Sequence, residues 1–360
     1  MARILCLDSD THFSGHPGGQ AKFTEDFVEP LADEHDVEVV TVGSFEQRNR
    51  ESVIYRSLVR AEDVSRRTQM SFARSQIDVV RQEGHRFDLI IENFIPPIGP
   101  SGLPRLTSTP VIGLANFSFW DEMSAKYHLP FQRMTRRRLQ WYQWITTTHE
   151  SVARRIRGIT PDTRVQSFGQ LLSAERNLWN EVPGAHALYL GRPDVHQKGM
   201  DLLVRALHSL GDSAPPVSVG GFDASHPAWT KLTRRWPLPE SVTVHGYVRG
   251  VEKERLLRAA RLLLLPSRYE GPSYVPLEGA VHGVPTVAFD LECFEDRRAA
   301  MYLARPYSID DFARQIMVGF GDEELFAEKR RAAQALVVAT RAQDPRRDFR
   351  ALVNEVLGTS

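Results

Sequence analysis

The chain has 360 residues, of which 42% are apolar and 25% charged, and this favours two folded domains and excludes a largely disordered protein. Lysine and arginine together number 45, as do aspartate and glutamate, and this balance excludes the global basic field of a nucleic-acid binder. The two cysteines lie in opposite halves of the chain, without the close spacing of a zinc, redox or disulfide motif. The balanced charge favours a neutral partner or a small molecule. No apolar run approaches the ~18 residues of a membrane-spanning helix, so we expect a cytoplasmic protein.

Short apolar, β-branched runs alternate with helical patterns along the chain, which is typical of βαβ units and parallel sheets. In the first half these runs are 3–7, 37–42, 87–91, 111–114 and 145–148. After an irregular stretch the rhythm restarts, with runs at 187–190, 217–219, 242–244, 262–265 and 286–289. We therefore predict an α/β chain of two Rossmann-like, doubly wound domains, 1–170 and 171–343, that face each other across a cleft.

The last segment of the chain has the pattern of an amphipathic helix over 345–357. Asp344 suits an N-cap and Pro345 suits a first helical position. The apolar residues that follow at helical spacing are Phe349, Leu352, Val353, Val356 and Leu357. Because this stripe comes after a completed second sheet, the helix needs a surface on which to bury it.

A loop with two basic side chains follows the predicted strand 187–190. It has the sequence GRPDVHQKG and leads into a helical pattern over 200–210, so Arg192 and Lys198 lie at the entry to a helix. Free N–H groups and the helix dipole attract anions at such a place, and a guanidinium with an ammonium suits a diphosphate. The alternative is a pair of solvated charges on a loop.

Two glutamates with seven residues between them follow the predicted strand 262–265. Glu270 lies in a Gly- and Pro-rich loop and Glu278 in the next helix, about 12 Å apart if the segment were wholly helical. That separation suits the two ends of one elongated ligand, with Glu270 facing a sugar and Glu278 accepting hydrogen bonds from a ribose diol. The backbone groups at the helix start that could bind phosphate or sugar hydroxyls are those of Pro272, Ser273 and Tyr274.

Together these two segments resemble the donor half of retaining glycosyltransferases of the GT-B fold, in particular family 4, the group 1 glycosyltransferases. In that family a strand leads into a Gly-Arg loop with a Lys before a Gly. Further on, an E-x7-E element precedes a Gly-x-Pro turn, which is found here at residues 283–285. The resemblance is strong over residues 186–305 and weak in the N-terminal half.

The resemblance implies a division of roles among these side chains. Arg192 and Lys198 would bind the diphosphate of a nucleotide sugar. Glu270 would bind the transferred sugar, and Glu278 would bind the ribose. In such enzymes the chain crosses back at its end, so helix 345–357 is expected to pack on the N-terminal domain.

The N-terminal half carries weaker signals. GHPGGQ follows the first predicted strand but is not G-x-G-x-x-G, so a dinucleotide fingerprint is absent. The family often has a Gly pair here, near the donor phosphate and the acceptor, which Gly18 and Gly19 match; a bare turn is the alternative. We expect His16 and Asn116 on the acceptor side.

Asn116 stands where many family members have a His near the reaction centre. An amide cannot take a proton, so a proton step assisted by this side chain is in doubt. Transfer is not excluded, because in the front-face mechanism usually proposed for the family the leaving phosphate oxygen receives the acceptor proton.

The residues Asp8, Ser9 and Asp10 spell D-x-D, the metal-binding signal of the other large glycosyltransferase fold. The motif is short and follows the first strand, and the donor motif needs no metal. We therefore expect no metal and no cofactor, with the nucleotide-diphosphate sugar acting as donor substrate.

Between residues 131 and 157 the chain is basic and aromatic. The basic and aromatic residues are Arg133, Arg136, Arg137, Arg138, Trp141, Tyr142, Trp144, Arg154, Arg155 and Arg157. Such a face could make peripheral contact with an anionic membrane that bears a lipid acceptor. The alternative is a surface helix whose tryptophans pack inward.

These observations predict a metal-independent, retaining hexosyltransferase or related glycosyltransferase. Its acceptor would be a glycan, a lipid-linked compound or a small molecule. One alternative is a sugar-nucleotide-binding protein without transfer activity, and another is an enzyme of the same fold that couples a non-sugar group.

Overall fold

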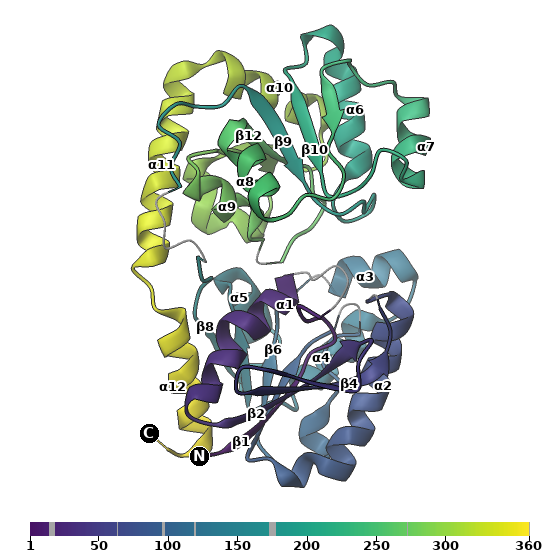
Figure 1. Ribbon diagram of the computed structural model, residues 1–360, viewed down its shortest axis with the longest axis vertical. Helices are drawn as coiled ribbons and strands as arrows, with labels where there is room; N and C mark the ends of the chain where they lie inside the picture. The colour runs from purple at the N-terminus through teal and green to yellow at the C-terminus, as the bar shows by residue number, and fades with distance from the viewer. Residues whose placement is uncertain are drawn as a thin grey trace. The chain divides into compact units, whose positions relative to one another are not determined.

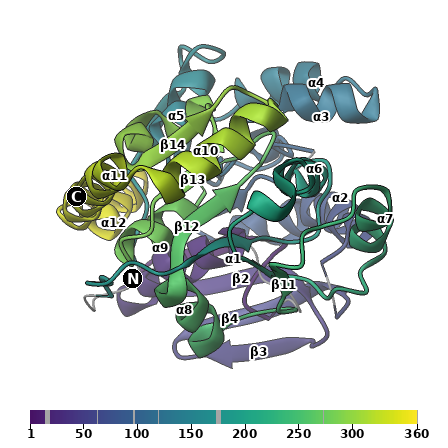
Figure 2. The same cartoon turned by 90° about the horizontal axis from the view of Figure 1, so that it is seen from above.

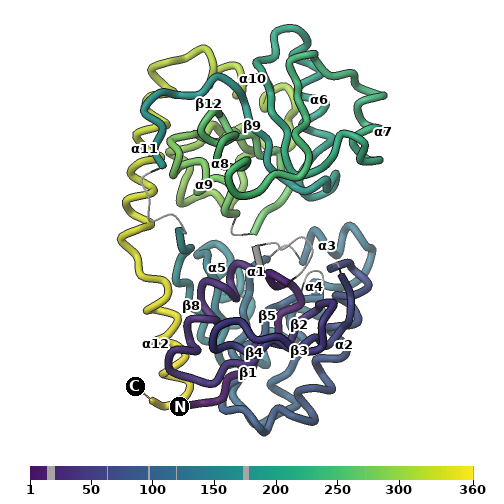
Figure 3. The backbone as a smooth tube through the Cα atoms, in the orientation of Figure 1, coloured from purple at the N-terminus to yellow at the C-terminus, as the bar shows by residue number. Residues whose placement is uncertain are grey.

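The computed structural model describes residues 1–13, 19–62, 64–95, 98–118, 120–172, 178–271 and 273–359. The chain forms two compact units, which can be followed by colour in Figures 1 and 3. Unit 1 comprises Met1–Leu171 together with Gln343–Ser360, and unit 2 comprises Leu172–Ala342. The C-terminal segment of the chain is therefore part of unit 1.

Unit 1 is built on an eight-stranded sheet with the order β3-β4-β2-β1-β5-β6-β7-β8. Its strands are β1 (Arg3–Leu7), β2 (Asp36–Gly43), β3 (Gln47–Arg50), β4 (Val53–Arg60), β5 (Leu89–Asn93), β6 (Val111–Leu114), β7 (Trp144–Thr147) and β8 (Arg164–Ser167). Neighbouring strands are parallel, except that β3 pairs antiparallel with β4 in an edge hairpin that the apolar runs do not predict. The strand order reverses between β1 and β5, so the topological switch point lies at their carboxyl ends.

The helices of unit 1 include three short ones in a row that follow β1. The helices are α1 (Gly19–Phe23), η1 (Thr24–Val28), η2 (Glu29–Asp33), α2 (Arg66–Glu83), η3 (Gly84–Arg86), η4 (Leu103–Arg105), α3 (Trp120–Tyr127), α4 (Phe131–Leu139), α5 (Glu150–Arg157) and α12 (Pro345–Leu357). α2 begins with a capping box in which the Ser65 hydroxyl accepts a hydrogen bond from the Thr68 N–H, while Thr68 accepts one from the Ser65 N–H.

The closing helix α12 packs into the core of unit 1. The Asp344 side chain caps it by accepting a hydrogen bond from the backbone N–H of Arg347 at 3.0 Å. The Phe349 ring is buried against Phe23, Phe27 and Phe168, from segments far apart in the sequence. Leu352 and Val353 of the apolar stripe are buried as well, and Val356 and Leu357 are half-buried against the same core.

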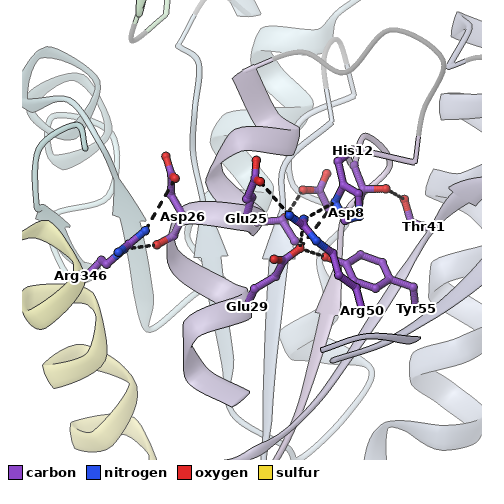
Figure 4. A network of polar contacts seen from close by, with 11 residues as sticks. Asp8, His12, Glu25, Asp26, Glu29, Thr41, Arg50, Tyr55 and Arg346 are labelled. Atoms are coloured by element: carbon purple, nitrogen blue, oxygen red, sulfur yellow. Dashed lines mark hydrogen bonds and ion pairs between the residues drawn. The ribbon is translucent and has the colours of Figure 1, made fainter. Parts of the chain in front are cut away.

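Arg346 adds a polar contact at the start of α12. Its Nε donates a hydrogen bond of 2.8 Å to the backbone carbonyl of Asp26, and its Nη2 lies 3.9 Å from the Asp26 carboxylate (Figure 4). Burial raises the pKa of the Asp26 carboxyl, while the nearby cations act in the opposite direction.

Unit 2 is built on a six-stranded, all-parallel sheet with the order β11-β10-β9-β12-β13-β14. Its strands are β9 (His186–Leu190), β10 (Val217–Gly220), β11 (Val242–Val244), β12 (Ala260–Leu265), β13 (Thr286–Phe289) and β14 (Met301–Ala304). This is the Rossmann order, with a reversal between β9 and β12.

Helices cover both faces of this second sheet (Figure 2). They are α6 (Met200–Leu210), η5 (Gly211–Ser213), α7 (Pro227–Arg235), α8 (Gly250–Ala259), α9 (Val275–Val281), η6 (Glu292–Ala300), α10 (Ile309–Gly321) and α11 (Glu323–Arg341). Alternate residues of β12 point to opposite faces: Leu262 and Leu264 pack in the layer of α6 and α10, and Leu263 packs in the layer of α8. The predicted α/β fold of two doubly wound sheets is confirmed.

Candidate functional site

In unit 2 the predicted site residues gather at the topological switch point. β9 and β12 are parallel neighbours that end at Leu190 and Leu265. The loops that follow them leave the sheet at the same edge, where open α/β sheets bind ligands. These two loops, 191–199 and 266–274, carry Arg192, Lys198, Glu270, Ser273 and Tyr274.

An ion pair between Lys198 and Glu270 joins the two loops. Lys198 Nζ lies 2.6 Å from Glu270 Oε1, and the side chains are 18% and 4% exposed. The fully buried Ser267 hydroxyl donates a second hydrogen bond of 2.6 Å to the same carboxylate oxygen. Away from bulk water these contacts are stronger than at the surface, so the position of the Glu270 carboxylate depends on both donors.

Arg268, in the second loop, donates a hydrogen bond of 2.8 Å to the Val195 carbonyl of the first loop. Its guanidinium makes two hydrogen bonds to the Asp201 carboxylate, at 2.8 and 2.7 Å, and these raise the pKa of Arg268. Gly199, the residue after Lys198, has a φ of 65°, and a Cβ there would lie 1.9 Å from the Pro266 carbonyl oxygen. Only glycine fits this close approach, which explains the Lys-Gly pair before α6.

Arg192 lies on the same loop but takes no part in the ion pair with Glu270. Its side chain is 63% exposed, and its nearest carboxylate is Asp194, at 3.7 Å. The guanidinium also donates a hydrogen bond to the Gln197 side chain. Arg192 is therefore an exposed cation at the rim of the loop, whereas Lys198 is mostly enclosed.

Glu278 lies in α9 and has a different cation as partner. Lys253 Nζ, from α8, is 2.7 Å from Glu278 Oε1, and both side chains are about one-third exposed. Thus each of the two predicted glutamates pairs with its own lysine. Lys253 was not among the predicted residues, because nothing in its local sequence links α8 to α9.

The segment between the two glutamates is supported by a buried arginine. Arg297, from η6, is buried and donates a hydrogen bond of 3.1 Å to the Ser273 carbonyl. Its other nitrogens bind the Asp296 carboxylate at 2.9 Å. Ser273 is buried and Tyr274 directly precedes α9, whereas Pro272 lies outside the described residues.

In unit 1 the D-x-D aspartate Asp8 is fully buried at the carboxyl end of β1. It accepts hydrogen bonds from the Thr24 hydroxyl at 2.5 Å and from the Asp10 backbone N–H at 3.1 Å. Burial raises the pKa of Asp8 to about 6, while hydrogen bonds from Thr24, Asp10 and Asn93 act in the opposite direction. Within the described ranges, no three His, Cys, Asp or Glu side chains are placed to hold a metal ion.

A polar network beside this strand end was not predicted from the sequence (Figure 4). Arg50, from β3, donates hydrogen bonds to Glu29 at 2.9 Å, to Glu25 at 3.0 Å and to His12 Nδ1 at 3.1 Å. Since a guanidinium has only donors, His12 Nδ1 must accept, and burial and then Arg50 lower the pKa of the imidazole. Tyr55 also donates to Glu29, so the network ties the β3–β4 hairpin to η1 and η2 and, through His12, to the loop after β1.

The remaining predicted residues of unit 1 are described in part. Gly19 is the first residue of α1, whereas His16 and Gly18 lie outside the described residues. Asn116 follows β6 and is half-buried. Its Nδ2 is buried without a hydrogen-bond partner in the part of the chain that the structure describes. An amide N–H left in this state favours a ligand or water that can accept a hydrogen bond.

Comparison with solved structures shows the class of fold. The chain is similar to the sucrose-phosphate synthase of Thermosynechococcus elongatus, with a TM-score of 0.76, 16% identity and all of both chains covered. It is also similar to Anabaena HepE in complex with UDP and glucose, with a TM-score of 0.71, 16% identity and all of both chains covered. A trehalose 6-phosphate synthase of Burkholderia multivorans gives a TM-score of 0.69 and 11% identity, covering 99% of this chain and 96% of that one. The fold is that of the GT-B glycosyltransferases.

A comparison with family models adds a match in unit 2. Residues 184–320 match the family described as glycosyl transferases group 1. This segment contains both loops of the switch point, and the resemblance inferred from the sequence is confirmed there. No curated protein matches the chain by sequence.

Proposed function

We propose that the protein is a retaining glycosyltransferase, a hexosyltransferase in the first instance, that uses a nucleoside-diphosphate sugar as its donor. The observation that carries this proposal is the enclosed Lys198–Glu270 pair at the switch point of the sheet, within the matched residues 184–320. Solved neighbours in complex with UDP and with UDP-glucose support a donor of this chemical class.

The cations act on the leaving group. The bond between the anomeric carbon and the diphosphate oxygen breaks, and the acceptor oxygen bonds to the same face of the sugar. The acceptor proton passes to the departing phosphate oxygen. Lys198 and Arg192 offset the charge that grows on the diphosphate, a kind of stabilisation worth roughly 10²- to 10³-fold in rate.

The glutamates bind the two ends of the donor. Glu270 has one oxygen engaged by Lys198 and Ser267, and it accepts hydrogen bonds from sugar hydroxyls and stabilises positive charge at the ring. Glu278 accepts hydrogen bonds from the ribose diol, with Lys253 as its neighbour. Backbone groups of Ser273 and Tyr274, with Pro272, bind phosphate or sugar hydroxyls.

We propose that the reaction is metal-independent, because lysine and arginine supply the positive charge that a metal ion supplies elsewhere. No cofactor is assigned, and the nucleotide sugar is a substrate. Gly18, Gly19, His16 and Asn116 retain their predicted roles near the donor phosphate and the acceptor.

A second candidate function is sugar-nucleotide binding without transfer. Asn116 favours this second function, because it has an amide at a position where a proton-accepting His is common in the family. Enzymatic coupling of a non-sugar group is a further alternative on the same fold.

Incubation with labelled UDP-, GDP-, ADP- and dTDP-hexoses, with and without candidate acceptors, separates these functions. A transferase moves the labelled sugar to an acceptor, or slowly to water when no acceptor is present. A binding protein leaves the donor intact. Glu270→Gln should lose about 100-fold in turnover and still bind the bare nucleotide. The matched control is Glu252→Gln, at an exposed glutamate of α8 that pairs with Arg255, and it should keep full turnover. Binding of the donor without any turnover by the unaltered protein would refute the transferase.

A further inference from the structure

The basic segment 131–157 does not form one face in the structure. Tyr142 is buried, and Trp144 packs against the core of unit 1. The Trp141 ring lies over the backbone at Gly102, where an added Cβ would come within 2.5 Å of it. The aromatic side chains of this segment therefore pack inward, as the alternative interpretation held. The arginines that stay exposed come from two separate helices: Arg133, Arg136 and Arg137 from α4, and Arg154 and Arg157 from α5.

A different basic surface lies on α2. A hollow of about 430 Å³ runs along its exposed side, lined by Arg66, Arg67, Met70, Ser71, Arg74 and Ser75. Three of these six side chains are cationic, and none is a carboxylate. Met70 is an apolar residue that is 41% exposed among them.

The turn between α3 and α4 adjoins the start of α2. The Arg66 guanidinium lies over the Tyr127 ring, 5.1 Å from its centroid, and the Tyr127 and Phe131 rings are 6.0 Å apart. At this turn Leu129 is 52% exposed, and Arg133 is exposed in the first turn of α4. We call Arg66, Arg67, Met70, Arg74, Leu129 and Arg133 the α2–α4 surface. The helices α2 and α4 are labelled in Figure 1.

The arginines of the α2–α4 surface differ from those at the other end of α2. Among the described residues, none of its four arginines forms an ion pair with a carboxylate. In contrast, the arginines at and beyond the other end of α2 are paired: Arg81 with Asp78 at 3.8 Å and Arg86 with Glu83 at 3.6 Å. The chain as a whole has zero net charge. The α2–α4 surface nevertheless gathers four arginines without carboxylate partners in the described part of the chain, beside the exposed apolar side chains of Met70 and Leu129.

We propose that the α2–α4 surface docks on an anionic lipid bilayer. The arginines are attracted to the negative headgroups, and Leu129 and Met70 enter the interface between headgroups and acyl chains. A soluble polyanion would satisfy the arginines but would leave both apolar side chains in water, so the bilayer fits the surface better. Over the described residues, no helix is long and apolar enough to cross a membrane, so this contact would be peripheral.

The test is sedimentation of the full chain with vesicles of phosphatidylcholine alone and with vesicles in which one lipid in three is phosphatidylglycerol. The chain should sediment only with the anionic vesicles. It should be released when salt rises from about 0.1 M to about 1 M, which shortens the Debye length from about 10 Å to about 3 Å. Replacing Arg66, Arg67 and Arg74 together by Gln should weaken partitioning about 100-fold, at about fivefold per arginine.

The matched control replaces Arg60, Arg81 and Arg86 by Gln. It makes the same change of charge on the same unit, but at arginines that are paired with carboxylates. This control should change partitioning less than about threefold. Leu129→Ser, which leaves the charge unchanged, should weaken binding about tenfold. Failure of the unaltered chain to bind anionic vesicles, or equal losses in both triple variants, would overturn the proposal. The proposal would also be overturned if Leu129→Ser bound the anionic vesicles fully and soluble polyphosphate released the chain from them. That result would indicate a site for a soluble polyanion.

Discussion

Removal of the Lys198 ammonium should destabilise unit 2, because among the described residues it leaves the enclosed Glu270 carboxylate with the Ser267 hydroxyl as its remaining side-chain donor. The perturbation is Lys198→Met, which keeps most of the side-chain length and removes the charge. The two atoms of the pair are 2.6 Å apart and the carboxylate is 4% exposed, so water cannot readily replace the lost contact. A charge left without its partner in such a place costs about 3 kcal/mol.

The complementary change should cost less. In Glu270→Gln the amide oxygen still accepts from Ser267, and the Lys198 ammonium, which is 18% exposed, still reaches water. We expect a loss of about 1.5 kcal/mol from this variant. The double variant has no charge left without a partner, so its loss should be smaller than the sum of the single losses by about 2 kcal/mol.

Hydrogen exchange of the amides in β9 and β12 measures these losses, because a chain of two units need not unfold in one step. A loss of 3 kcal/mol corresponds to exchange that is roughly 100-fold faster. Lys231→Met is the matched control, since this exposed lysine of α7 has no carboxylate partner among the described residues, and it should change the rates by less than about twofold. Losses that simply add in the double variant would refute the reasoning, because the pair would then contribute no coupling.

Three further predictions concern other parts of the molecule. Burial raises the pKa of Glu92 from 4.5 to about 6. A raised carboxyl pKa makes the folded state lose stability as pH rises, so Glu92 should account for about 2 kcal/mol of the stability that unit 1 loses between about pH 4 and about pH 7, beside the share of Asp8. Glu92→Gln should remove the share of Glu92, measured by exchange of the β5 amides, and a difference from the unaltered chain that does not change with pH would contradict this. Phe349→Ala should cost unit 1 about 3 to 5 kcal/mol because the ring is buried among three other aromatic rings; unchanged exchange in β1 would make α12 a dispensable tail. Glu278→Ala should raise the donor KM about tenfold with kcat nearly unchanged, and an equal fall in both kcat and kcat/KM would show that Glu278 acts in the transition state.

The strands that could be predicted are those with an apolar run, which a buried position in a parallel sheet requires. β1, β6, β9 and β13 have such runs and were predicted within a residue of their observed ends. β3 has the sequence QRNR and lies at the sheet edge, so only its backbone, through pairing with β4, defines it as a strand. The edge strand β8 was missed because its sequence, RVQS, has a single apolar residue. The edge strand β14 was missed although its sequence, MYLA, is an apolar run.

The candidate site could be predicted only as far as local sequence carries a physical signal. Lys198 and Glu270 lie at loop positions next to apolar strands, where chemistry is expected, and the structure joins them. The contacts of Arg297 with Ser273 and of Lys253 with Glu278 depend on how separate elements pack. No spacing along the chain encodes such contacts, because they are set by the register and packing of the whole unit.

The central claim is that the two loops of unit 2 bind the diphosphate of the donor. Calorimetric titration with UDP, GDP, ADP and dTDP, each beside its parent nucleoside, tests this claim most directly. At a concentration 100 times its Kd the preferred diphosphate should also stabilise the chain by about 2.7 kcal/mol. Lys198→Met and Arg192→Ala should weaken diphosphate binding by at least about tenfold while leaving nucleoside binding unchanged, and Lys231→Met should affect neither. Equal losses of diphosphate and nucleoside binding in the first two variants, or no binding of any diphosphate by the unaltered chain, would contradict the account.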